Sequence, residues 1–136
     1  MKTLTDYTME AVGKLLDDKG AFFAFGSEQF EEKKVAGLVY VALGAGLICP
    51  KDNAIELWEG LDRIQAEGVA QDLAENGKKN IIRRELANYE YAYTYDLDDT
   101  AAAVECYGIT PEEVAEEAKA YMVDYRKWEE AEARGE

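Results

Sequence analysis

Residues 38–49, LVYVALGAGLIC, are the stretch that most restricts how this chain folds. They are rich in Val, Leu and Ile, they stop at Pro50, and they are the strongest strand signal in the sequence. The aromatic stretch AFFAF at 21–25 is short, is bounded by glycines, and predicts a buried strand. We expect the two strands to pair antiparallel, with Gly44 and Gly46 making a bulge, bend or close approach. A purely helical fold is therefore not expected.

Most of the remaining sequence has the periodicity of amphipathic helices. Apolar residues recur every three or four positions, and glycines end two of these segments, at Gly20 and Gly77. The helices expected from these patterns cover residues 3–19, 27–34, 53–76, about 78–95, 97–106 and 111 to about 133. The sequence therefore predicts an α+β fold, a mostly helical single domain over residues 1–136 with a small two- or three-stranded antiparallel sheet. Residues 130–136 are expected to form a frayed tail.

The segment 53–76 has the longest apolar stripe and is expected to be the central helix. The stripe consists of Ile55, Trp58, Leu61, Ile64, Val69 and Leu73. It predicts that Trp58 is buried, whereas Trp128, near the end of the chain, should be more exposed.

Four tyrosines at alternate positions follow, in the stretch NYEYAYTYDLDD. Tyr89 and Tyr93 continue the helical face of Ile82 and Leu86, which predicts that both lie in the core of a helix. Tyr91 and Tyr95 would then lie nearer the surface. A strand over residues 88–95 remains the alternative, because the tyrosines also alternate with period two.

Three helix starts have capping signals. An Asn or Thr with a Glu three positions later is a capping box, and an Asp before a helix supplies a similar cap. The residues concerned are Asn53 with Glu56, Asp96, and Thr110 with Glu113, with Pro111 at the first helical position.

The composition excludes several kinds of chemistry. The chain has no histidine, which removes Ser-His and Cys-His catalysis and histidine-based zinc sites. Cys49 and Cys106 are far apart in sequence, share no metal-ligand spacing, and are expected to be small buried hydrophobic residues. An enzyme built from this chain would have to use carboxylates, tyrosines, lysines or a bound metal. We expect no cofactor and no metal site, and a protein that is not an enzyme.

The chain has a formal net charge of −14, and the charge is uneven. Residues 96–136 contain 13 acids and 4 bases, a net charge of −9. Such a surface repels phosphate, so direct binding of nucleic acid is not expected, whereas a basic protein surface would be attracted. The alternative is that the charge serves only solubility. No stretch is long and apolar enough for a membrane span and no signal-peptide pattern begins the chain, which predicts a cytoplasmic protein that does not bind membranes.

The last helix provides the candidate site. Its first turns are rich in glutamate, and a seam with alternating steps of four and three residues ends in aromatic side chains. The candidate partner-binding residues are Glu112, Glu113, Glu116, Glu117, Tyr121, Tyr125 and Trp128. The seam, which begins at Val114 and Ala118, would otherwise pack on the protein's own core or join two copies into a homo-oligomer.

Two further patterns have alternative interpretations. Glu112-Glu113-x-x-Glu116 and Glu59-x-x-Asp62 place acids on helical turns, as in magnesium-dependent nucleotide hydrolases, although the order of the two motifs is reversed. That enzyme is the alternative function. The basic stretch KKNIIRR at 78–84 is expected to form ion pairs within the protein, and the alternative is a site for an anion or an acidic partner.

Four stretches, GAFFAFGSEQFEEKK, GLVYVALGAGLICPKDNA, DLAENGKKNIIRRELANYE and CYGITPEEV, together resemble a family of small acidic proteins of unknown function from bacteriophages and mobile elements of gut bacteria. The resemblance spans most of residues 10–118. It implies a phage or its bacterial host as the setting, and the host cytoplasm as the location. Small acidic non-enzymes in that setting are often inhibitors of host defence, some by imitating the phosphate charge of nucleic acid. We therefore expect a non-enzymatic binding protein that inhibits a host nucleic-acid-binding or defence protein through a negatively charged helical face.

Overall fold

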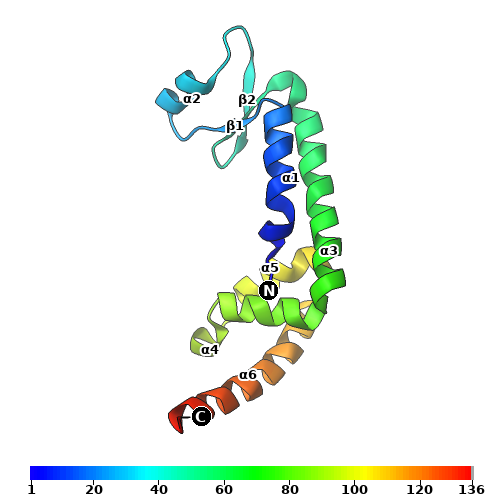
Figure 1. The fold of residues 1–136 in the computed structure, drawn as a ribbon, viewed down its shortest axis with the longest axis vertical. Coiled ribbons are helices and arrows are strands. Elements are labelled where there is room, and N and C mark those ends of the chain that lie inside the picture. Colours follow the sequence, from blue (N-terminus) through cyan, green and yellow to red (C-terminus); the bar gives the residue numbers. More distant parts are fainter. Residues whose placement is uncertain (136) are drawn as a thin grey trace. The chain divides into compact units, whose positions relative to one another are not determined.

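The computed structural model describes residues 1–135 of the chain (Figure 1). It is 72% helical and contains one three-stranded antiparallel sheet, which confirms the predicted mostly helical α+β class. The chain divides into two compact units, residues 1–68 and 69–136. Each unit is described by itself, and the expectation that residues 1–136 form one domain remains a prediction. Among the described residues, no helix combines the length and the apolarity that crossing a membrane requires.

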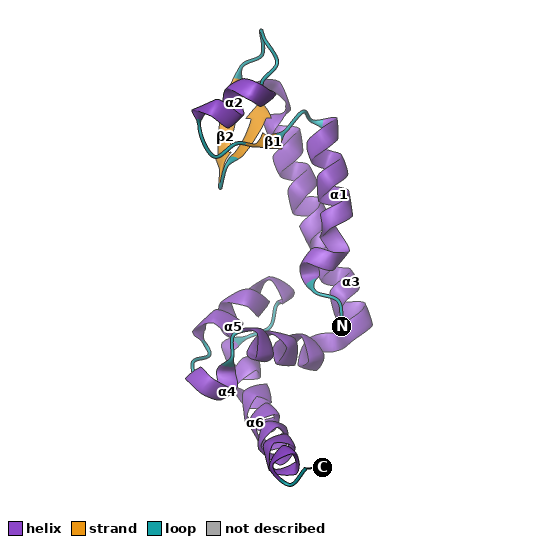
Figure 2. Cartoon of the chain, turned by 60° about the vertical axis from the view of Figure 1, so that its left-hand side comes forward, coloured by secondary structure: helices purple, strands orange, loops and turns teal. Residues whose placement is uncertain are grey.

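The first unit is built on two helices, α1 (Leu4–Asp18) and the first half of α3 (Ala54–Asn88). They lie side by side in both views (Figures 1 and 2). Two glycines of α3 permit this approach. A Cβ atom on Gly60 would lie 2.6 Å from Leu15 Cδ2, and one on Gly68 would lie 2.5 Å from Thr8 Cγ2. A Cβ at Gly60 would require the Leu15 side chain to move, and one at Gly68 would require the short Thr8 side chain to shift, so glycine at both positions permits the observed contact.

The sheet has three strands in the order β1-β3-β2, namely β1 (Phe22–Phe23), β2 (Tyr40–Gly44) and β3 (Leu47–Pro50). The antiparallel pairing of 21–25 with 38–49 is confirmed by the β1–β3 pair. The predicted bulge or bend at Gly44 and Gly46 is confirmed, because residues 38–49 fold back on themselves there as the hairpin β2–β3, with a register shift between Ala42 and Gly44, and the sheet has three strands. The two residues between the strands, Ala45 and Gly46, have φ values of +51° and +81°, which a tight hairpin turn of this type requires.

A small aromatic cluster joins this sheet to α2 (Ser27–Lys33). The ring of Phe22 lies 6.3 Å from that of Phe30 and 5.5 Å from that of Tyr40, and the rings of Phe30 and Tyr40 are 5.6 Å apart. These tilted and edge-to-face contacts are favourable aromatic geometries.

The buried core of the first unit is nevertheless small. Its buried hydrophobic side chains are Cys49 and Leu57, together with Pro50. The prediction that Trp58 is buried and Trp128 more exposed is wrong, because both side chains are 56% exposed. Helix α3 turns Leu57, Gly60 and Gly68 toward α1, and Trp58 lies about 100° around the helix from Leu57. Ile55, at the start of the predicted stripe, is 74% exposed.

Helix α3 is interrupted at Gly77, as predicted. This residue has φ +75° and ψ 158°, which no α-helical residue adopts, and a second helical segment continues to Asn88. The start of α3 differs from the prediction. Asn53 belongs to a short 3-10 turn, Lys51–Asn53, and its side-chain amide donates to the Lys19 carbonyl, while Glu56 pairs with the Lys19 ammonium.

The second unit contains the end of α3, then α4 (Tyr91–Thr94), α5 (Asp98–Val104), a 3-10 turn (Glu105–Tyr107) and α6 (Pro111–Ala133). Its core is larger than that of the first unit. The buried hydrophobic residues are Ile81, Ile82, Leu86, Val104, Tyr107, Ile109, Val114, Ala118 and Met122. Helix α6 extends through most of the expected tail, and Glu136 lies outside the described residues.

Of the two caps predicted in this unit, the one at the start of α6 is confirmed. The Thr110 hydroxyl accepts from the Glu113 backbone N–H at 3.1 Å, and the Glu113 carboxylate accepts from the Thr110 N–H at 3.2 Å, which is the predicted capping box. The predicted Asp96 cap is wrong, because Leu97 is the N-cap residue of α5; the Asp96 carboxylate accepts from the Asp98 N–H at 2.9 Å one position before it.

The tyrosine segment is helical, as predicted, but its burial is not. Glu90 and Tyr95 have φ values of +54° and +55°, so a break separates α3 from the short α4 and rotates the side chains that follow. Tyr93 and Tyr89, predicted in the core, are exposed, Tyr93 by 77%. Tyr95 is exposed, as predicted, and Tyr91 is half-buried. Cys49 is buried as expected, but Cys106 is exposed, contrary to prediction.

Candidate functional site

Two of the four predicted glutamates of α6 are held by the basic segment 78–84. The Glu113 carboxylate lies 3.3 Å from Lys78 Nζ, and the Glu117 carboxylate lies 2.9 Å from Arg83 Nε. Hydrogen bonding to the Thr110 backbone, assisted by Lys78, lowers the pKa of Glu113. Glu117 is only 9% exposed. The prediction that KKNIIRR forms ion pairs within the protein is therefore confirmed. The Glu117 carboxylate is not open to a partner, whereas the Glu113 side chain is 40% exposed and already paired with Lys78.

The other two glutamates lie on the wrong side of α6 for the predicted surface. At 100° per residue, Glu112 projects about 180° and Glu116 about 140° away from Tyr121. Both are exposed, and Glu116 pairs with Lys119 at 3.7 Å across one turn. The structure therefore does not bring the four glutamates and the aromatic side chains together on one face.

The three aromatic residues do form a continuous feature. The ring of Tyr121 lies 6.2 Å from that of Tyr125, which lies 5.6 Å from the ring of Trp128. The Tyr125 hydroxyl donates to the hydroxyl of Tyr93 at 3.4 Å, and this hydrogen bond raises the pKa of Tyr125 to about 12. Tyr121 and Tyr125 are half-buried, while Trp128 is 56% exposed. We call these four residues, Tyr93, Tyr121, Tyr125 and Trp128, the aromatic row.

The α6 charges that project beside the aromatic row are negative, and the guanidinium of Arg83 on α3 lies among them, paired with Asp124 and Glu117. On α6, Asp124, Glu129 and Glu132 project within about 80° of Tyr121, whereas Arg126 and Lys127 project about 120–140° away. Asp124 pairs with Arg83 at 2.7 Å. Glu129 and Glu132 are exposed and make no ion pair with the described residues. The aromatic row with Glu129 and Glu132 is the α6 surface, the candidate site in this protein.

Two parts of this unit are not predictable from the spacing of residues in the sequence. Tyr93 was assigned to the core because its four-residue spacing from Tyr89 continued the stripe of α3, and the break at Glu90 is not evident from residue types. The second is a buried polar cluster around Asp72, whose side chain is fully buried.

Asp72 receives four hydrogen bonds from three side chains. Arg84 donates two, at 3.1 and 3.0 Å, Tyr107 donates one at 2.5 Å, and Asn76 donates one at 2.8 Å. Burial alone would raise the pKa of Asp72, but these hydrogen bonds outweigh it and lower that pKa. Because Asp72 is inaccessible to solvent and its oxygens are already paired, the cluster holds the helices together and does not present a reactive group.

Neither metal motif suggested by the sequence is assembled in the described part of the chain. Among residues 1–135, no group of three or more Cys, Asp or Glu side chains is arranged to hold a metal ion. Glu113, the middle residue of the Glu112-Glu113-x-x-Glu116 motif, already serves the helix cap and Lys78. Beside these residues lies a groove of about 430 Å³, lined by Lys78, Lys79, Ile82, Glu113, Glu116, Glu117 and Ala120.

Comparison with known proteins identifies a family, but the function of that family is unknown. A family model described as a family of unknown function (DUF7659) matches residues 4–127. No curated protein matches the chain, and no solved structure does.

Proposed function

The chain belongs to DUF7659, a family of unknown function, and we propose that it is a non-enzymatic binding protein that engages a basic protein segment through the α6 surface. The observation that carries the proposal is the aromatic row, in which the exposed Trp128 ring packs against Tyr125 and Tyr125 packs against Tyr121, with the exposed carboxylates of Glu129 and Glu132 on the same helix.

The chemistry of the α6 surface fits arginine and lysine side chains. A guanidinium or ammonium group is attracted to the face of a tryptophan or tyrosine ring and pairs with a neighbouring carboxylate. Tryptophan and tyrosine are also the residues that most often anchor protein interfaces. A net charge of −14 would speed the encounter with a basic partner and disfavour nucleic acid itself.

The resemblance to phage-associated proteins supplies the setting of the proposal. A host protein that binds nucleic acid has a basic surface of the kind that the α6 surface fits, and an acidic protein bound there would exclude the nucleic acid. In this setting the protein acts in the host cytoplasm as an inhibitor of that host or defence protein.

A titration with an arginine-rich peptide tests the proposal. We expect calorimetry to detect binding to the arginine peptide and not to the same peptide with citrulline, which keeps the shape and removes the charge. Replacing Trp128 by Ala should weaken binding about tenfold, the size of a typical interface anchor. Trp58→Ala is the matched control, because Trp58 is equally exposed at 56% but lies on α3. Equal losses in the two variants, or equal binding of the citrulline peptide, would reject the α6 surface as the binding site.

A further inference from the structure

The first unit has too small a core for its length. Within residues 1–68, all of which are described, the buried hydrophobic side chains are Cys49, Leu57 and Pro50, whereas the second unit buries nine. Units of fewer than about 70 residues that lack a large core usually gain stability from a metal, disulfides or association. Cys49 and Cys106 are free, and no metal-binding group is found among residues 1–135. The apolar side of the α1–α3 pair is therefore a surface that association would stabilise.

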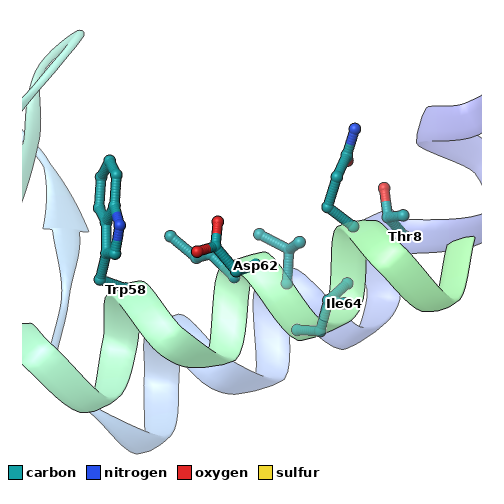
Figure 3. Close-up of a pocket in the computed structure, with 7 residues that line it drawn as sticks. Thr8, Trp58, Asp62 and Ile64 are labelled. Atoms are coloured by element: carbon teal, nitrogen blue, oxygen red, sulfur yellow. The ribbon is translucent and has the colours of Figure 1, made fainter. Parts of the chain in front are cut away.

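That side contains both a hollow and a projection. A groove of about 290 Å³ is lined by Thr8 and Val12 of α1 and by Trp58, Leu61, Asp62, Ile64 and Gln65 of α3. Trp58 stands at one end of the groove, Thr8 lies at the other, and Asp62 projects from between them (Figure 3). The indole is 56% exposed beside a hollow of mainly apolar side chains.

We infer that this groove face binds the same face of a second copy of the chain, with the Trp58 indole of each copy seated in the groove of the other. A two-fold interface uses one patch on both subunits, so the patch must be complementary to itself. A projecting aromatic side chain next to an apolar hollow meets this condition. Two pairs of helices joined in this way form a four-helix layer, a common solution for helical hairpins with one apolar side.

The distribution of charge favours a second copy over a basic partner at this face. Copies with a net charge of −14 repel one another, so they meet most readily where charge is sparse. Asp62 is the one charged residue that lines the groove. The acids of α1, which are Asp6, Glu10, Asp17 and Asp18, project about 120–160° away from Val12, and Glu59 of α3 projects about 100° away from Trp58. A basic partner would find one carboxylate here, in contrast to the α6 surface.

Replacing Asp62 distinguishes a second copy of the chain from a basic partner, because the substitution changes the two affinities in opposite directions. In a homodimer the two Asp62 carboxylates enter one interface and repel each other, so Asp62→Asn should tighten the dimer. A basic partner would lose an attractive charge, and the same substitution would weaken its binding. Added salt also acts in opposite directions, since it screens repulsion between like chains and attraction to a basic partner.

Sedimentation velocity of the full chain over a range of concentrations tests the inference. We expect a reversible dimer that strengthens with salt, that weakens about tenfold or more in Trp58→Ala, and that tightens in Asp62→Asn. Ile55→Ala is the control, because Ile55 lies on α3, is 74% exposed and does not line the groove. A wild-type chain that is monomeric throughout, a Trp58→Ala chain that dimerises like wild type, or an Asp62→Asn chain that dimerises no more tightly would overturn it.

A second measurement does not depend on a variant of the groove. In a Trp128→Phe chain Trp58 is the sole tryptophan, and its quenching by acrylamide should fall as the protein concentration rises. Quenching that is independent of concentration across the range would also overturn the inference. Trp58→Ala should leave binding of the arginine peptide unchanged, so failure of the dimer and failure of the proposed function are separate results.

Discussion

Glu116 and Glu117 are neighbours in a run of glutamates, yet only one is open to solvent. Glu117 is 9% exposed and bonded to Arg83, whereas Glu116 is exposed and pairs only across its own helix. Because Glu117→Gln leaves a partly buried guanidinium with a weaker partner, it should lower the free energy of unfolding by about 1–2 kcal/mol. Glu116→Gln should change it by less than about 0.5 kcal/mol. Urea unfolding followed by circular dichroism distinguishes the two, and equal stabilities would mean that the Arg83 ion pair contributes nothing.

Asp72 is the residue on which the second unit depends most. Asp72→Asn should cost about 3 kcal/mol, because it removes the buried carboxylate that holds two of the Arg84 hydrogen bonds and leaves Glu85, 3.1 Å from Arg84 Nε, to balance the guanidinium. Glu67→Gln, at an exposed position of the same helix, is the control.

The pH dependence of stability tests whether the hydrogen bonds to the Asp72 carboxylate stabilise its charged form. Since the pKa of Asp72 is lowered in the folded protein, its stabilisation is complete above the unfolded pKa of about 3.9 and is lost as the pH falls further. The difference in unfolding free energy between wild type and Asp72→Asn should therefore shrink between about pH 5 and pH 2. A difference that grows in acid would contradict the assigned hydrogen bonds.

Individual side chains were predicted less well than the elements that contain them. The stripe through Trp58 is genuine in the sequence, but the buried face of α3 is decided by Gly60 and Gly68, where α1 approaches. The spacing of apolar residues predicts which face of a helix is buried. A glycine has no side chain and adds nothing to that pattern, even where a neighbouring helix packs against it. The pairing of Glu117 with Arg83 was not predictable from local spacing either, because the two residues lie 34 positions apart and meet only in the folded chain.

Helix ends and turns were predicted well where a local rule governs them. The Thr110 capping box and the break at Gly77 depend on residues that are close in sequence. The bend at Gly44 and Gly46 was predicted from the glycines, but the tight hairpin was not, because the apolar residues on both sides continue without a polar turn sequence.

The break in α3 yields a paired prediction on two glycines. Gly77→Ala should destabilise the protein by about 2 kcal/mol, because a Cβ is strained at φ +75° and ψ 158°. Gly13→Ala, within α1 and with no atom close to the new Cβ, should stabilise it by about 0.5–1 kcal/mol. Opposite shifts of the urea midpoint are expected, and a stabilising Gly77→Ala would mean that the helix does not break there.

The choice between a binding protein and a magnesium-dependent hydrolase concerns the protein as a whole. A metal that binds the folded state raises the melting temperature in proportion to ln(1 + [metal]/Kd). We expect Mg²⁺ or Mn²⁺ to shift the melting temperature by less than about 1 °C relative to NaCl at matched ionic strength. A metal-specific rise that disappears in Glu112→Gln would support the hydrolase and contradict the proposed function.

The most direct test of the α6 surface compares two double variants of one helix. Glu129→Gln/Glu132→Gln and Glu112→Gln/Glu116→Gln each remove two exposed glutamates and leave the same net charge, but only the first pair adjoins the aromatic row. In titrations with the arginine-rich peptide, the first pair should weaken binding about fivefold or more and reduce its dependence on salt. The second pair should bind within about twofold of wild type, since distant exposed charges are screened. Equal losses of affinity in the two variants would show that only net charge matters and would contradict a site on α6.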